Sequence, residues 1–133
     1  MNQTITTENR RFTFTDQSGE VVASCALRSA DIGTYQRCMK VMEYFQGNPA
    51  EGVKTLEDYA KFNETIEAKV CYILGYDARS ELFGRIAAAA VLPDGRPFVR
   101  VVLDAISAEL NKAEQERQGK RMAAVLKHTA KYQ

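Results

Sequence analysis

Apolar and polar residues alternate in two short runs near the start of the chain. Arg11 to Thr15 (RFTFT) and Glu20 to Leu27 (EVVASCAL) are rich in β-branched or aromatic residues, and Asp16 to Gly19 between them is a turn sequence. With a period of two, Phe12 and Phe14 share one face of the first run. The pattern predicts a β-hairpin with one packed face. Because an isolated hairpin is marginal in water, it must lie on helices or pair its edge with another copy.

From Ser29 the apolar residues recur every three or four positions, which predicts helices. The first helix has Asp31 in its first turn and stops at Gly47-Asn48-Pro49, and the second begins at the N-cap Thr55 and ends at Gly75. The apolar stripe of the first helix contains Ile32, Tyr35, Met39, Met42 and Phe45. The stripe of the second contains Leu56, Tyr59, Phe62, Ile66, Val70 and Ile73.

Two further helices are predicted in the second half of the chain. The third covers Arg79 to Val91, where the four alanines of Ala87 to Ala90 would let another helix approach closely. Leu92 to Pro97 is a turn, and Pro97 can open a fourth helix. The apolar stripe of this fourth helix contains Phe98, Val99, Val102, Ile106, Leu110 and Ala113. We expect Gly119 to interrupt it, and a narrower stripe follows at Met122, Val125, Leu126 and Thr129.

These elements predict a mainly α fold (α+β), in which an N-terminal β-hairpin is followed by a four-helix domain with a long C-terminal helix. We divide the chain into a flexible N-terminus (1–9), a single helical domain with the hairpin (10–118) and a basic amphipathic C-terminal segment (119–133). A length of 133 residues with 45% hydrophobic residues fits one core, which needs neither disulfides nor a structural metal.

Composition limits the classes of partner and the cellular compartment that we expect for this protein. Eighteen Lys and Arg residues against seventeen Asp and Glu leave a net charge of +1, so there is no general attraction to nucleic acid or to an anionic membrane. The longest apolar run, Ile86 to Leu92, is far shorter than the ~20 residues that span a bilayer. Met1 to Asn9 is polar and does not read as a signal peptide. We therefore expect a cytoplasmic protein without membrane partners.

The sequence offers little for catalysis or metal binding. Cys25, Cys38 and Cys71 do not have the spacing of a zinc site, and we interpret each as a small buried apolar residue. The single histidine, His128, is expected to be exposed to solvent. Gly-rich phosphate loops, G-x-S-x-G and H-E-x-x-H are all missing from the sequence. We expect no catalytic residue, no metal, no cofactor and no enzymatic activity.

Two features favour binding to another protein. From Arg117 onward there are five basic residues and no acidic one. These cations could stabilise the helix end or pair with an acidic face, or the apolar stripe among them could be a docking helix for a groove. Methionines and aromatic residues on the first two helices are mostly core, but a groove left between them would suit varied apolar helices. The candidate partner-binding residues are Tyr35, Met39, Met42, Phe45, Tyr59, Phe62, Met122, Val125 and Leu126.

Four features occur in order along the chain: the hairpin, a second helix ending in CYILGYD at Cys71 to Asp77, the ELFG element at Glu81 to Gly84, and the long C-terminal helix with a basic end. With these features, the layout from about Arg10 to Ala130 resembles the tail assembly chaperones of long-tailed bacteriophages and related prophages. The resemblance implies a protein of the host bacterial cytoplasm that binds the tape measure protein, keeps it soluble and assists polymerisation of the tail tube.

The resemblance also implies partners and a processing feature. The partners that it implies are the tape measure protein and the tail tube protein. The residues themselves allow a second copy of the chain as a further partner, joined through the hairpin edge or the C-terminal helix. Members of this family are often also made as a longer frameshifted product, whose extra segment would join near Lys127 to Gln133. The alternative function is a small helical regulatory or nucleic-acid-associated protein that uses the basic C-terminal helix on phosphate. Steep salt dependence of binding would favour this alternative.

Overall fold

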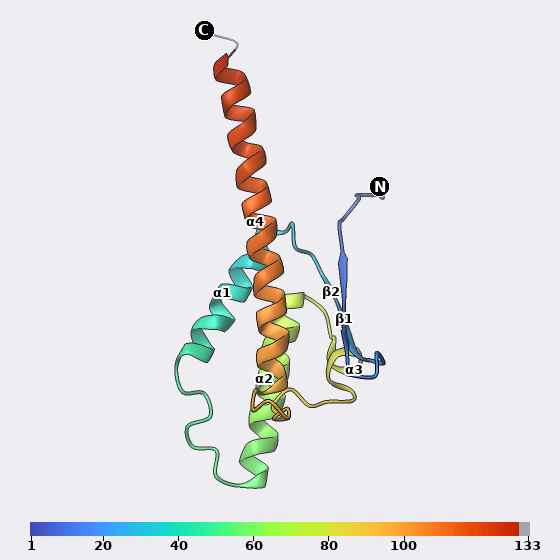
Figure 1. The fold of residues 1–133 in the computed structure, drawn as a ribbon, viewed down its shortest axis with the longest axis vertical. Helices are drawn as coiled ribbons and strands as arrows, with labels where there is room; N and C mark the ends of the chain where they lie inside the picture. Colours follow the sequence, from blue (N-terminus) through green and yellow to red (C-terminus); the bar gives the residue numbers. More distant parts are fainter. Residues whose placement is uncertain (131–133) are drawn as a thin grey trace.

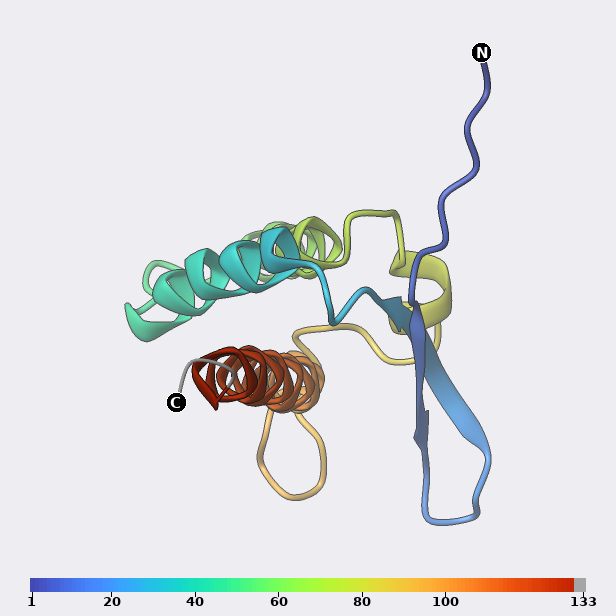
Figure 2. The same cartoon turned by 90° about the horizontal axis from the view of Figure 1, so that it is seen from above.

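The computed structural model describes residues 1–130, with side chains up to residue 127, and has a β-hairpin followed by four helices within that range. The elements are β1 (Arg10–Thr15), β2 (Val21–Leu27), α1 (Ile32–Gln46), α2 (Leu56–Leu74), α3 (Arg79–Phe83) and α4 (Phe98–Ala130). α4 is the longest helix, and its C-terminal part extends past the other elements (Figure 1). α1 and α2 lie on one side of it, and the hairpin and α3 lie on another (Figure 2). The predicted mainly α fold with an N-terminal hairpin and a long C-terminal helix is confirmed.

The hairpin forms as the alternating pattern predicts. β1 and β2 are antiparallel, with Phe12 opposite Cys25. The turn is closed by the carboxylate of Asp16, whose Oδ1 accepts hydrogen bonds from the backbone N–H groups of Ser18 (2.8 Å) and Glu20 (3.1 Å). Gly19 has a φ of 85°, which favours glycine at this position.

The packed face of the hairpin meets the start of α4 through aromatic rings. The ring of Phe98, the first residue of α4, lies edge-on to Phe14 of β1 at 6.1 Å and to Phe83 of α3 at 5.9 Å. Edge-to-face contacts at this distance are favourable. An ion pair between Arg10 and Glu109 joins the other end of β1 to α4. The hairpin therefore packs on the helices, as its marginal stability alone requires.

α1 and α2 begin and end close to the predicted residues. Asp31 is the N-cap of α1, just before its first turn, and its carboxylate accepts from the N–H of Gly33 at 2.8 Å. α2 begins with a capping box formed by Thr55 and Asp58, and it ends at Gly75, whose φ of 82° is left-handed.

The buried faces of these helices differ partly from the predicted stripes. In α2, Ile66, Val70 and Ile73 are buried, whereas Leu56 is 84% exposed and Tyr59 is 41% exposed. In α1 the buried residues are Thr34, Cys38 and Val41, whereas Ile32 and Met39, expected in the stripe, are about half exposed. The prediction chose the large apolar residues of α1, whereas its fully buried positions are occupied by smaller residues.

The predicted third helix from Arg79 to Val91 is wrong after its first turn. α3 ends at Phe83, and the alanine-rich segment that follows is irregular. A Cβ at Gly84 would collide with the carbonyl oxygen of Ser80, so the C-cap residue at which α3 ends has to be glycine. The carbonyls of Ala88 and Ala90 then accept hydrogen bonds from the N–H groups of Val99 and Phe98, each at 2.8 Å. The alanines thereby satisfy two of the free N–H groups at the start of α4.

The expected interruption at Gly119 is also wrong, because α4 is continuous from Phe98 to Ala130. A Cβ added to Gly119 would meet nothing within 4 Å, so neither close packing nor an unusual backbone angle explains a glycine there. A glycine inside a helix costs only about 1 kcal/mol relative to alanine, and the surrounding helix-forming residues outweigh this cost. None of the helices in the described part of the chain has the length and apolar character needed to cross a membrane.

Candidate functional site: an apolar groove and a projecting helix

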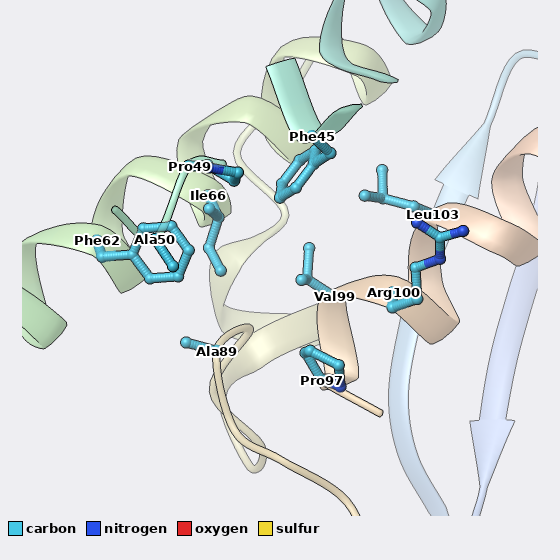
Figure 3. A pocket seen from close by; sticks show the side chains of 10 residues that line it. All are labelled: Phe45, Pro49, Ala50, Phe62, Ile66, Ala89, Pro97, Val99, Arg100 and Leu103. Carbon is cyan, nitrogen blue, oxygen red and sulfur yellow. The ribbon is translucent and has the colours of Figure 1, made fainter. Parts of the chain in front are cut away.

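An open apolar groove of about 350 Å³ lies where α1, α2 and the start of α4 meet (Figure 3). Its floor is formed by Ile66 of α2 and by Val99 and Leu103 of α4, which are all buried. Its walls include Phe45 at the end of α1 and Phe62 of α2, and both rings are only partly buried. The remaining lining residues are Pro49, Ala50, Ala89, Pro97 and Arg100.

Local structure explains why these residues meet. α1 ends at Gln46, so Phe45 lies on its last turn, and the loop that carries Pro49 and Ala50 turns back toward α2. Ala89 is held beside α2 by two hydrogen bonds. Its N–H donates to Oδ1 of Asn63 (2.9 Å), and its carbonyl accepts from the hydroxyl of Tyr59 (2.8 Å). These two hydrogen bonds fix the position of Ala89 and with it one side of the groove.

Arg100 is the one charged residue among the ten that line the groove. Its side chain is 55% exposed, and its Nε lies 3.3 Å from Oδ1 of Asp104, one turn further along α4. Figure 3 shows the guanidinium group at the rim beside Leu103. The groove therefore combines an apolar floor with a cation at its edge.

Beyond the groove, the second candidate surface is the end of α4 that extends past the other elements (Figure 1). Ala113 is the last buried residue of α4, and residues 118–127 are all exposed. Arg117 still contacts the body, because its Nη1 donates to the carbonyl of Ala30 at 3.0 Å. Met122 is 60% exposed and Leu126 is 62% exposed. We call residues 118–130 the projecting segment.

The apolar stripe of the projecting segment does not continue the buried stripe of α4. An α-helix turns by about 100° per residue, so Met122 lies roughly half a turn around the axis from Ala113, nine residues earlier. Leu126 lies a similar angle from Leu110. The stripe therefore faces away from the side on which α4 packs against the body.

The structure places the nine candidate partner-binding residues in five different settings. Phe45 and Phe62 line the groove together, and Tyr35 and Met42 are partly buried against the core. Met39 is exposed on the outer face of α1. Tyr59 is partly exposed on α2, and its hydroxyl holds Ala89. The residues exposed on the projecting segment are Met122, Val125 and Leu126. The side chains of His128, Thr129 and Lys131 lie outside the described residues.

Several groove residues were not predicted from the sequence. Val99 was predicted only as core, while Leu103 and Arg100 lay outside the predicted apolar stripe of the fourth helix. Ala89 and Pro49 belong to the alanine run and to a helix stop, where the sequence gives no sign of a binding surface. The one usable signal was Pro97, which opens α4 and thereby places Val99 and Leu103 at the helix start.

A polar network joins the hairpin to the region between α2 and α3. The hydroxyl of Tyr76 donates to Glu81 and accepts from the N–H of Ala26 at 2.7 Å, and Glu81 also pairs with Arg11 at 2.8 Å. Burial and the bond to Glu81 raise the pKa of Tyr76 to about 12. The Tyr76 hydroxyl and the Arg11 guanidinium lower the pKa of Glu81. Every group in this network has a partner, which indicates a structural role.

The three cysteines are free thiols. Cys25 and Cys38 are buried as predicted, whereas Cys71 is only partly buried. Burial raises the pKa of Cys25 to about 11 and also raises the pKa of Cys38. Among the side chains that the structure describes, no three His, Cys, Asp or Glu residues gather as metal ligands would.

Comparison of the chain with protein-family models, with curated proteins and with solved structures finds no match. The groove and the projecting segment are therefore the features of this chain that bear on its function.

Proposed function

We propose that this protein is a helix-binding chaperone of the tail assembly type, acting in the bacterial cytoplasm. Its substrate is the tape measure protein, a long and helical apolar chain that would aggregate if left uncovered. By shielding apolar stripes of that chain, the protein keeps it soluble until tail tube subunits polymerise around it. This function is binding rather than catalysis.

The observation that carries the proposal is the open apolar groove. Ile66, Val99 and Leu103 form its floor, and the partly buried rings of Phe45 and Phe62 form its walls. Grooves of this composition bind the apolar face of an amphipathic helix, whose side chains at positions i, i+3 and i+4 enter together. Aromatic walls supply large contact area and tolerate varied partner sequences.

The projecting segment supports the same function by a separate surface. Met122 and Leu126 are more than half exposed on one face of a helix that extends beyond the body. Grouped apolar side chains exposed in this way mark a surface for another protein. A long tape measure helix could contact the groove and the projecting segment of one molecule.

The test is co-expression with the tape measure protein of the same genome. The gene should lie between those for the tail tube and the tape measure protein. The tape measure protein should be soluble when expressed with the wild-type chain and insoluble without it. Phe62→Asp, which places a charge on the groove wall, should abolish this effect. Lys61→Asp is the matched control, because Lys61 is exposed on the same helix.

Two outcomes would overturn the proposal. One is a genome without tail genes beside this one, and the other is an insoluble tape measure protein whether or not the chain is present. The alternative phosphate-binding function predicts the opposite salt behaviour. Binding to phosphate weakens steeply as salt rises, whereas binding of a helix in the groove depends mainly on buried apolar surface and weakens much less.

A further inference from the structure

Charged residues border both candidate surfaces, and they indicate which kind of apolar helix binds there. We infer that the helix bound in the groove is acidic, and that one of its carboxylates pairs with Arg100. The inference rests on the proposed function and adds the chemistry by which this site selects its partner. The occupant is an amphipathic helix with Asp or Glu about one turn from its apolar anchor residues.

Arg100 is suited to this role by its position and its geometry. It lies at the rim of a groove whose other nine lining residues are uncharged, so a helix seated on the apolar floor passes beside the guanidinium group. Its contact with Asp104 is made through Nε, and a guanidinium group carries five N–H donors, so Arg100 can pair with a second carboxylate as well. A guanidinium fork can donate two parallel hydrogen bonds to one carboxylate.

The existing pair with Asp104 does not remove the need for a partner carboxylate. Both side chains are about half exposed, and the distance of 3.3 Å joins residues one turn apart on the helix surface. Such exposed pairs contribute little in water. When a partner helix covers the rim, Arg100 loses hydration, and an uncharged partner offers nothing in return. An acidic partner replaces the lost water with a charged hydrogen bond.

The charges of the projecting segment are a second, independent observation that favours an acidic partner. Lys120, Arg121 and Lys127 are exposed there, and no acidic residue follows Arg117 in the sequence. All seventeen acidic residues lie before Arg117, together with thirteen of the eighteen basic ones, so that part of the chain is acidic overall. The projecting segment is therefore cationic on a chain whose remainder is acidic overall, and the one charged residue that lines the groove is also a cation, Arg100, beside Asp104. This contrast favours an acidic helix over a basic one at both places.

The experiment measures the binding of three designed peptides to the full-length chain. Each peptide is an amphipathic helix of about 20 residues, long enough to form in isolation when rich in alanine. All three carry the same leucine stripe, and they differ at one position a turn away, which holds Glu, Gln or Lys. Dissociation constants come from fluorescence anisotropy with wild type, Arg100→Gln and Arg100→Glu. The control is Arg85→Gln, because Arg85 is equally exposed but lies against the hairpin.

The Glu peptide should bind wild type about tenfold more tightly than the Gln peptide, which is the usual size of one charged hydrogen bond. The preference should disappear in Arg100→Gln, persist in Arg85→Gln and reverse in Arg100→Glu, which should favour the Lys peptide. Circular dichroism checks that each variant is folded. Recovery of binding with reversed charge excludes a merely structural effect of the substitution.

The outcomes separate this inference from the proposed function. If the Glu and Gln peptides bind wild type equally, and both are lost in Phe62→Asp, the groove binds helices but does not select acidic ones. If wild type and Arg100→Gln prefer the Glu peptide over the Gln peptide to the same extent, Arg100 is not the residue that selects an acidic helix. If no peptide binds wild type, or if Phe62→Asp binds all three unchanged, the groove is not the helix site and both proposals fail.

Discussion

Ile66 shows how one residue of α2 serves both the core and the groove. It is 1% exposed, and it forms part of the groove floor. Ile66→Ala should lower the free energy of unfolding by about 2–5 kcal/mol, because the truncation removes buried methyl groups and leaves a cavity. Denaturant unfolding measures this loss. Leu56→Ala is the control on the same helix, since Leu56 is 84% exposed and should change stability by less than about 0.5 kcal/mol. An unchanged midpoint for Ile66→Ala would contradict the assigned core.

The cysteines make a second prediction at the scale of single residues. Alkylation needs the thiolate, so a buried thiol with a raised pKa reacts slowly. At mildly alkaline pH, Cys71 should therefore be modified first, because it is only partly buried, while Cys25 and Cys38 stay protected until the protein unfolds. Mass spectrometry of the intact protein and of its peptides follows the order.

Denaturant provides the control for this labelling, since all three cysteines should then react at similar rates. A disulfide in the native protein, or labelling of Cys25 as fast as Cys71, would show that the packing around β2 is looser than described. Replacing any one of the three by serine should leave helix binding intact, because none of them lines the groove.

Single residues also show how far the sequence could predict the site. Phe45 and Phe62 could be chosen because large aromatic residues at helical spacing favour either a core or a groove. Arg100 and Ala89 could not, since an arginine or an alanine has the same local pattern at a groove as elsewhere. Their role depends on which segments meet, and that is decided by contacts between residues far apart in the chain.

At the scale of elements, the hairpin, α1 and α2 were predicted nearly to the residue because their ends have local chemical signals. Thr55 and Asp58 form a capping box, and Gly75 is left-handed. The alanine run after α3 was misassigned for the opposite reason. Alanine favours a helix, but the backbone of Ala88 and Ala90 is needed to accept hydrogen bonds from the start of α4. This tertiary requirement overrides the local preference and is not visible in the sequence.

The attachment of the hairpin to α3 yields a prediction about pH. The pKa of Glu81 is lowered in the folded protein by the Tyr76 hydroxyl and by Arg11. A carboxyl group with a lowered pKa stabilises the fold above its unfolded value, near 4.5, and this contribution is lost as pH falls through the folded value. Glu81→Gln should therefore lower the melting temperature at neutral pH, and the difference from wild type should shrink in acid.

Melting curves of both proteins between neutral pH and about pH 3 test this prediction, because that interval brackets the unfolded carboxyl pKa. Glu51→Gln is the control, since Glu51 is exposed in the loop before α2. It should have almost no effect at any pH. A difference between Glu81→Gln and wild type that stays constant down to the lowest pH would show that the carboxylate does not stabilise the hairpin through its charge.

At the scale of the whole molecule, a compact body is joined to a helix that extends beyond it (Figure 1). Ala113 is buried against the body, and Arg117 donates a hydrogen bond to it. The exposed stripe of the projecting segment faces away from the side on which α4 packs against the body. Deleting residues 120–133 should therefore leave the body folded, with a melting temperature within a few degrees of wild type. The truncated protein should still bind short peptides in the groove but lose affinity for a longer tape measure fragment that reaches both surfaces.

Point variants decide whether this loss comes from the stripe or from its charges. Leu126→Ser should reproduce most of the loss, because it removes an exposed apolar side chain from the stripe. Lys127→Gln, its neighbour, should change mainly the salt dependence of binding, since exposed charges act over distances that salt screens. If truncation instead lowers the melting temperature by many degrees and leaves affinity for the long fragment unchanged, the segment stabilises the body and the groove is the whole binding surface.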